Sequence, residues 1–139
     1  VGISTATAEA GKNIFVQNCA MCHQVKGEGG LVGPQLDGIG NWGVKALTEK
    51  ILDPNRNISQ AFRTYNITLQ NGKLMSGLYR RTEGEVIVYA DPSGKEFSVA
   101  KNDIKENKLS QYTLMPDQFR NTIKEEDFYA LMKYLLSVK

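Results

Sequence analysis

One five-residue run constrains this chain more than any other feature: Cys19-Ala20-Met21-Cys22-His23. It holds both cysteines and the only histidine of the 139 residues. A disulfide would leave the adjacent histidine without a role, and a redox-active C-x-x-C pair is expected after a strand in a βαβ unit, which the residues before Cys19 do not resemble. A structural zinc ion needs four ligands, and the chain offers only these three sulfur or nitrogen donors. These three uses are disfavoured and stay open at this point.

Covalent attachment of a haem gives a role to all three side chains. Two thiols add to the two vinyl groups of one porphyrin, and the next residue, His23, then lies under the iron as an axial ligand. The motif therefore predicts one covalently bound haem c with its iron, tethered by Cys19 and Cys22 and ligated by His23. Because c-type haem is attached outside the cytoplasm, we expect a periplasmic or otherwise exported protein.

The single histidine limits the second axial position of the iron. Ligation by two histidines of this chain is impossible, and no distal histidine is available to cleave peroxide. A methionine, a lysine or water therefore takes the sixth position, or it is empty.

Size and charge narrow the class of protein. A chain of 139 residues suits one ordinary domain, so we treat residues 1–139 as a single domain. Seventeen basic and fifteen acidic residues give a formal charge of +2, which is too balanced to indicate binding to nucleic acid or to an anionic membrane. No apolar stretch approaches the roughly 20 residues that span a bilayer. The start at Val1 indicates a processed chain or a domain of a larger protein.

Amphipathic helices are predicted on both sides of the motif and at the C-terminus. Residues 7–19 place Gly11 and Phe15 on one face, and residues 44–52 form a helix that stops before Asp53-Pro54. A glycine inside a helix costs about 1 kcal/mol relative to alanine, which is best explained if another element crosses closely there. The last helix has apolar residues at helical spacing after a capping box at 122–125: Phe128, Leu131, Met132, Leu135 and Leu136.

These features resemble a class I cytochrome c. The similar elements are a Gly-x-x-x-Phe helix before C-x-x-C-H, then Gly33-Pro34, and a final helix with Leu-x-x-Tyr-Leu. The resemblance covers about residues 7–56 and 109–139, which would form the helical haem core. It implies that the first and last helices cross at Gly11, with Phe15 and Tyr134 beside the crossing. It also implies that the Pro34 carbonyl accepts a hydrogen bond from the second ring nitrogen of His23, which would strengthen His23 as a ligand.

The same resemblance implies the sixth ligand. In class I cytochromes c a loop with Met-Pro before the last helix supplies a thioether, and Met115-Pro116 matches it. Met21 lies inside the haem motif, Met75 lies in a strand-like run, and Met132 lies on the apolar stripe of the last helix. We therefore expect His23 and Met115 to bind the iron, a ligand pair that raises the reduction potential.

Residues 62–104 follow a different period. Apolar residues alternate with polar ones around Asn71-Gly72, a strong hairpin signal, which predicts three or four antiparallel strands. We expect a mainly α chain with the class I cytochrome c fold and this antiparallel insertion before the Met115 loop. Ile51-Leu52-Asp53-Pro54, Asn71-Gly72-Lys73 and Gly77-Leu78 are similar to cytochrome c domains of planctomycetes and verrucomicrobia. The insertion is either a lid over the haem edge or a docking surface for a partner.

Trp42 is a further candidate for haem binding. Its indole N–H could bind a haem propionate, or the ring could be a core aromatic with its N–H on a backbone carbonyl. Lys45 and Arg56 could pair with propionates, although solvated surface charges are the simpler interpretation.

The leading hypothesis is one-electron transfer, as a soluble carrier or as a module of a larger redox protein. No residue is assigned a catalytic role. The expected partners are redox proteins such as a dehydrogenase, an oxidase or another cytochrome; neither nucleic acid nor a transmembrane segment in this chain is expected. The alternative is a gas-binding or sensing haem protein with an open or labile sixth site.

Overall fold

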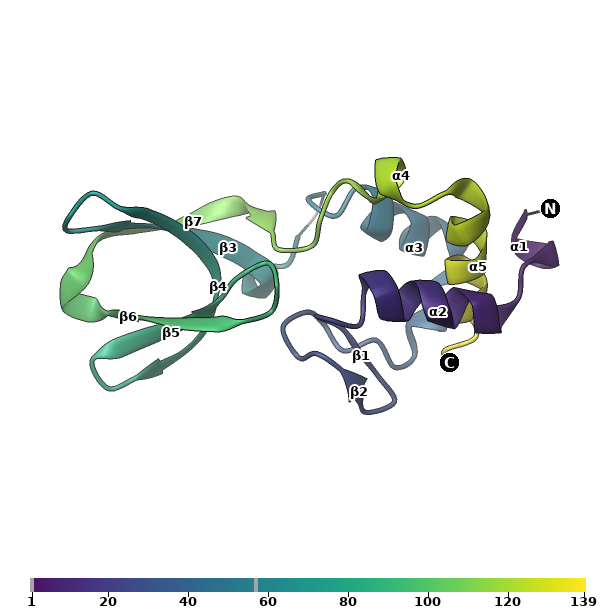
Figure 1. The fold of residues 1–139 in the computed structure, drawn as a ribbon, viewed down its shortest axis with the longest axis horizontal. Helices are drawn as coiled ribbons and strands as arrows, with labels where there is room; N and C mark the ends of the chain where they lie inside the picture. The colour runs from purple at the N-terminus through teal and green to yellow at the C-terminus, as the bar shows by residue number, and fades with distance from the viewer. Residues whose placement is uncertain (1, 57) are drawn as a thin grey trace. The chain divides into compact units, whose positions relative to one another are not determined.

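The computed structural model describes residues 2–56 and 58–139, which divide into two compact units. The helical unit consists of Val1–Arg56 and Pro116–Lys139, and the sheet unit consists of Asn57–Met115. The helical unit contains α1 (Gly2–Thr5), α2 (Ala8–Asn18), the short hairpin β1 (Gln24–Val25) and β2 (Glu28–Gly29), the 3-10 helix η1 (Ile39–Trp42), α3 (Gly43–Leu52), α4 (Phe119–Thr122) and α5 (Glu125–Leu136) (Figure 1).

The first and last long helices of this unit, α2 and α5, cross each other (Figure 1), and they meet at Gly11. A Cβ atom on Gly11 would lie 1.8 Å from the carbonyl oxygen of Ala130 and 2.7 Å from Cβ of Tyr134. Only a residue without a side chain fits there. The rings of Phe15 and Tyr134 pack beside the crossing, with centroids 5.6 Å apart and planes inclined at 53°. The predicted crossing and its two aromatic neighbours are confirmed.

The N-termini of α2 and α5 differ in how they are capped. The Thr7 hydroxyl accepts the N–H of Ala10 at 3.2 Å, so Thr7 is the N-cap of α2. The capping box predicted at 122–125 is wrong, because Thr122 belongs to α4 and Lys124 is the N-cap of α5 without a side-chain bond. Three acidic residues in the first turn of α5 still favour that helix start through the helix dipole.

The core of the helical unit is formed by the apolar faces of α2, α3 and α5. Leu131 and Met132 have no exposed surface, which confirms Met132 as a core residue. The other buried hydrophobic residues of these helices are Phe15, Leu47, Ile51, Ala130 and Leu135. Among the described residues, no helix is both long and apolar enough to cross a membrane.

The sheet unit is one antiparallel sheet of five strands in the order β6-β5-β4-β3-β7. Its strands are β3 (Arg63–Leu69), β4 (Leu74–Glu83), β5 (Val86–Ala90), β6 (Glu96–Ala100) and β7 (Ile104–Thr113). The turn at Asn71-Gly72 joins β3 to β4, as predicted, with Gly72 at φ +87°. The sheet is strongly curved, and β4 has a register shift between Tyr79 and Arg81 where it passes from β3 to β5 (Figure 1).

The prediction of a mainly α chain is wrong. About 37% of the residues are helical and about 30% are in strands, including the five-stranded sheet. The strands also continue past residue 104, because β7 runs to Thr113. The sequence of β7 is largely charged and polar, and its burial does not alternate regularly, so it has no clear strand signature. It becomes a strand because β3 offers it an unpaired edge.

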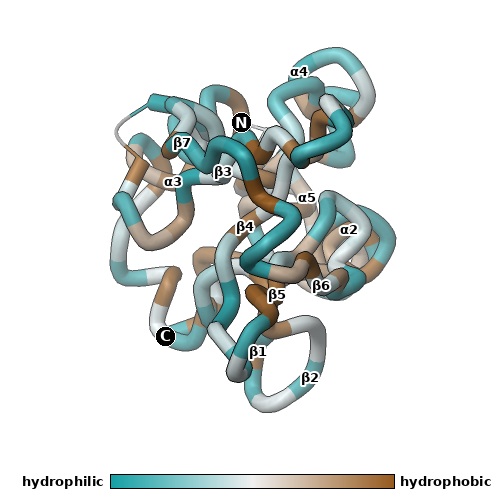
Figure 2. The backbone as a smooth tube through the Cα atoms, turned by 90° about the vertical axis from the view of Figure 1, so that its left-hand side faces the viewer, coloured by the Kyte–Doolittle hydropathy of each residue, from teal (hydrophilic) through white to brown (hydrophobic). Residues whose placement is uncertain are grey.

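Apolar side chains from several strands of this sheet pack together in a buried cluster. Ile67, Tyr89 and Val99 form a buried cluster, and Phe97 stacks on Tyr89 with ring centroids 5.6 Å apart. Hydrophobic residues run along β5, which lies between β4 and β6 (Figure 2). The Tyr89 hydroxyl is 3.0 Å from Nδ2 of Asn107, which donates to it across the sheet.

A buried polar cluster holds β7 against β3. Thr64 and Ser110 are only 6% and 8% exposed, and their hydroxyl oxygens are 2.6 Å apart. The Ser110 hydroxyl accepts the N–H of Tyr112 at 3.1 Å, and Nε of Arg63 donates to the Ser110 carbonyl at 2.6 Å. These bonds satisfy the backbone where the register shifts between Arg63 and Tyr65.

Ser110→Ala is expected to destabilise the sheet unit by about 2 kcal/mol, because it leaves buried polar partners unsatisfied. Hydrogen exchange should show faster opening at the Thr64 and Tyr112 amides. Ser76→Ala is the matched control, since Ser76 donates to Asn66 in an exposed pair at 3.0 Å. Equal effects of the two substitutions would show that burial of the cluster does not matter.

Candidate functional site

The haem motif forms a turn at the C-terminus of α2. Cys19 is the C-cap, and its N–H bonds the Phe15 carbonyl at 2.8 Å. The N–H groups of Cys22 and His23 both reach the Cys19 carbonyl, at 3.2 and 3.0 Å. Cys19 and Cys22 are half-buried thiols that are not joined to each other. Cys19, Cys22 and His23 therefore lie together within one compact turn.

His23 is oriented by a backbone carbonyl. Its Nδ1 lies 2.8 Å from the carbonyl oxygen of Pro34. A carbonyl can only accept, so Nδ1 carries the proton and the Nε2 lone pair is left to bind a metal. Burial lowers the pKa of His23 below its ordinary value, although the bond to Pro34 opposes this. The ring is therefore neutral at neutral pH, which is the form that ligates iron.

Gly33 packs directly against the imidazole ring. A Cβ atom on Gly33 would lie 2.8 Å from Cε1 and 3.0 Å from Nδ1 of His23. The N–H of Gly33 also bonds the Cys22 carbonyl at 2.7 Å. The ring of His23 is therefore confined by Gly33 and held at one nitrogen by Pro34. This role of Gly33 was not predicted from the sequence. The sequence feature that could have indicated it is the position of Gly33 directly before Pro34.

Burial raises the pKa of the Cys19 thiol to about 12, and the neighbouring Cys22 adds to the effect. Before haem attachment Cys19 is therefore a neutral thiol at neutral pH. The donor set consists of two thiols, separated by two residues in one turn, and a neutral imidazole with Nε2 available. These residues fit a covalently attached haem. Within residues 2–56 and 58–139, no group of three or more His, Cys, Asp or Glu side chains is placed to hold a metal ion.

The remaining candidates lie elsewhere. Trp42 ends η1 with 56% of its surface exposed, so it is not a core aromatic. Met115 lies half-buried in a bend after β7 and is the last residue of the sheet unit. The structure thus places Met115 in a different unit from Cys19, Cys22 and His23.

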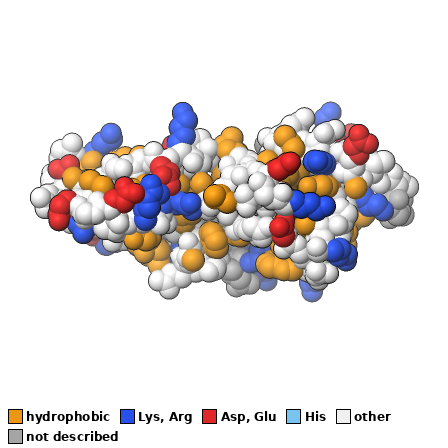
Figure 3. All heavy atoms as spheres, turned by 90° about the horizontal axis from the view of Figure 1, so that it is seen from below, with side chains coloured by type: hydrophobic (Ala, Val, Ile, Leu, Met, Phe, Trp, Pro, Cys, Tyr) orange, Lys and Arg blue, Asp and Glu red, His pale blue; other side chains and the backbone are white. Residues whose placement is uncertain are grey.

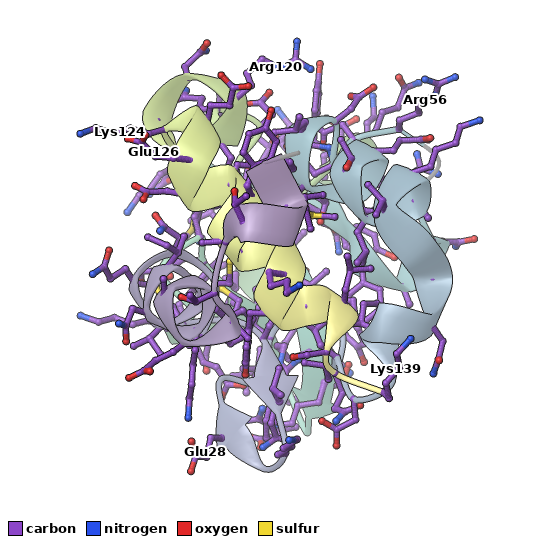
Figure 4. The ribbon with its side chains drawn as sticks, turned by 90° about the vertical axis from the view of Figure 1, so that its right-hand side faces the viewer. Glu28, Arg56, Arg120, Lys124, Glu126 and Lys139 are labelled. Carbon is purple, nitrogen blue, oxygen red and sulfur yellow. The ribbon has the colours of Figure 1, made fainter. Side chains whose placement is uncertain are left out.

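The two basic candidates are surface residues. Lys45 is exposed on α3. Arg56 is largely exposed and lies 3.6 Å from the carboxylate of Glu49 (Figure 4). Both placements agree with the simpler interpretation of solvated charges.

Comparison with known families identifies the class of this site. The sequence model of the cytochrome c family matches residues 8–80, more than half of the chain, and the match includes α2, the C-x-x-C-H turn and Pro34. The chain belongs to the cytochrome c family. It therefore carries a covalently bound c-type haem with its iron, which confirms the predicted cofactor, and its chemistry is haem-based electron transfer. Domains of this family are typically extracytoplasmic.

Proposed function

We propose that this chain is a one-electron carrier in which Cys19 and Cys22 tether the haem and His23 and Met115 bind its iron. The proposal rests on the 2.8 Å hydrogen bond from Nδ1 of His23 to the Pro34 carbonyl. Because Nδ1 holds the proton, the lone pair of Nε2 is available to bind the iron. The haem iron supplies the one-electron couple. The chain contributes fixed ligands and a confined imidazole, which keep structural change on electron transfer small.

The assignment of Met115 rests on the Met115-Pro116 pattern and on the placement of the other methionines. Met132 is fully buried in the helical core, Met21 is 61% exposed within the haem motif, and Met75 packs against the buried cluster of the sheet. A thioether opposite an imidazole favours ferrous iron and raises the reduction potential. We also propose that Trp42, exposed at the end of η1, donates its indole N–H to a haem propionate.

We infer that the two units act as one cytochrome domain. Met115 is the last residue of the sheet unit, and the next residue, Pro116, begins the second segment of the helical unit. The domain is proposed to be of the planctomycete and verrucomicrobia type. It works in the periplasm or an equivalent compartment, as a free carrier or within a larger redox protein, and it exchanges electrons with a dehydrogenase, an oxidase or another cytochrome.

Charge is expected to contribute little to partner selection. Acidic and basic side chains are interspersed on the face drawn in Figure 3. Several are paired: Arg81 contacts Glu96 at 2.8 Å and 2.9 Å and Glu83 at 2.8 Å. Two haem propionates would offset the formal charge of +2. We therefore expect electron-transfer rates to depend weakly on ionic strength.

Met115→Ala tests the proposed ligation. The unmutated ferric protein should show the weak far-red absorption band of a methionine–iron bond, and the ferrous protein should not react with carbon monoxide. The Met115→Ala protein should lose the band and bind carbon monoxide, because its sixth position is open. Met75→Ala, a half-buried methionine of the same unit, should keep both properties. Rapid carbon monoxide binding by the unmutated protein would contradict the assignment and favour the gas-binding alternative.

A further inference from the structure

The segment after the haem motif doubles back along it. Residues 30–37, here called the strap, run beside residues 20–26, which contain Cys22 and His23. Three backbone hydrogen bonds join the two segments: Gly30 N–H to Ala20 O at 2.8 Å, Gly33 N–H to Cys22 O at 2.7 Å, and Leu36 N–H to Gln24 O at 2.9 Å. Pro34, whose carbonyl meets His23, lies between the second and third of these bonds.

A side chain closes the end of the strap. Oδ1 of Asp37 accepts the backbone N–H of Lys26 at 2.6 Å, shorter than any of the three backbone bonds. Lys26 has φ +52°, a left-handed conformation that a lysine seldom adopts, and Gly27 follows at φ +82°. These two residues form the turn of the β1–β2 hairpin. One carboxylate thus joins the strap to the residue that turns this hairpin.

The position of the Pro34 carbonyl depends on how firmly the strap is held. The 2.8 Å bond to His23 and the close packing of Gly33 on the ring leave little tolerance for movement. Backbone bonds fix the strap at Gly33 and Leu36, and beyond Leu36 the Asp37 side chain makes the described contact to the hairpin. Asp37 is exposed, so its charge is well solvated and acts mainly through this hydrogen bond.

We propose that Asp37 is a positioning residue for the iron ligand: by latching the strap to Lys26 it holds the Pro34 carbonyl on Nδ1 of His23. This inference rests on the proposed role of His23 as an axial ligand. A firm bond at Nδ1 strengthens the imidazole as a donor and so favours ferric iron. Loosening the latch weakens that bond, exposes the Nδ1 proton to solvent and raises the reduction potential.

Exchange of the His23 Nδ1 proton with solvent tests the proposal, measured by nuclear magnetic resonance on the intact haem protein. The reduced protein under carbon monoxide is diamagnetic whether its sixth site is filled or open, so the measurement is independent of Met115. Asp37→Ala removes both the acceptor and the charge, whereas Asp37→Asn removes the charge and keeps an acceptor oxygen. We expect the His23 Nδ1 proton to exchange about fivefold faster in Asp37→Ala, because the net contribution of one hydrogen bond corresponds to about that factor. In Asp37→Asn the exchange rate should stay near that of the unmutated protein.

The potential provides a second readout. Both substitutions remove the same charge. A higher reduction potential in Asp37→Ala than in Asp37→Asn therefore reports only the loss of the hydrogen bond to Lys26. Asp91→Ala is the matched control, because Asp91 also accepts backbone N–H groups in a turn, from Ser93 and Lys95 in the sheet unit. It should leave the His23 proton unchanged. If Asp37→Ala does not fold, Asp37→Glu, which moves the carboxylate by one methylene, replaces it in the comparison with Asp37→Asn.

Two results would overturn the proposal. One is an equal exchange rate in Asp37→Ala and Asp37→Asn. The other is slow exchange in the double variant that combines Asp37→Ala with Lys26→Gly. Glycine adopts the left-handed turn conformation without strain. Slow exchange in that variant would therefore mean that Asp37 acts only by stabilising the turn. Failure of the ligand assignment itself is seen separately, because the ring protons of a histidine that does not bind the iron lack the large shift imposed by the haem.

Discussion

Gly11→Ala is expected to lower the free energy of unfolding of the helical unit by about 2 kcal/mol. The added methyl group would lie 1.8 Å from the carbonyl oxygen of Ala130 and 2.5 Å from its carbonyl carbon. Both are backbone atoms of α5, so the overlap is relieved only if the two helices separate. Overpacking costs about 3 kcal/mol at its upper range, and the better helix propensity of alanine returns only about 1 kcal/mol.

Urea unfolding of the haem protein, followed by far-ultraviolet circular dichroism, measures this effect. Asn13→Ala is the control, because Asn13 lies on the exposed side of the same helix and its replacement gains propensity without an overlap. It should be neutral or slightly stabilising. A Gly11→Ala protein as stable as the Asn13→Ala protein would show that the close crossing of α2 and α5 is not required.

Replacing both Cys19 and Cys22 by serine is expected to abolish covalent haem attachment. Serine is close in size to cysteine, but a hydroxyl is a far weaker nucleophile than a thiol at neutral pH and does not replace it in a thioether. Each single substitution should leave one attachment point. Haem that remains with the polypeptide on a denaturing gel, and haem extracted by acidified acetone, are the two measurements.

Met21→Ala is the control for these substitutions, because Met21 lies between the two cysteines with 61% of its surface exposed. It should retain the haem through denaturation. Extraction of the haem from the unmutated protein by acidified acetone would contradict c-type attachment.

The contrast between expectation and structure is clearest in the sheet unit. The hairpin at Asn71-Gly72 was predictable, because turn chemistry and alternation are local properties of the sequence. β7 was not predictable, since its polar sequence becomes a strand only through pairing with β3. The hydroxyl pair of Thr64 and Ser110, 46 residues apart, belongs to the same class of contact. The mainly α class that the local patterns predict therefore understates the strand content of the chain.

The haem site divides in a similar way. The cofactor followed from the spacing of Cys19, Cys22 and His23, because the chemistry of attachment lies within one turn of chain. The bond from His23 to Pro34 was expected from resemblance alone, and the structure contains it at 2.8 Å. The ligation by Met115 stays a prediction.

The sequence by itself determined what is encoded in neighbouring residues: the attachment motif, the faces of α2 and α5, and the glycine at their crossing. The tertiary structure decided which distant groups meet, such as Gly33 on the His23 ring and Asp37 on Lys26. Spacing along the chain carries the first kind of information because covalent geometry limits short segments to few conformations. The second kind depends on packing and backbone pairing, which are settled only when the whole chain folds.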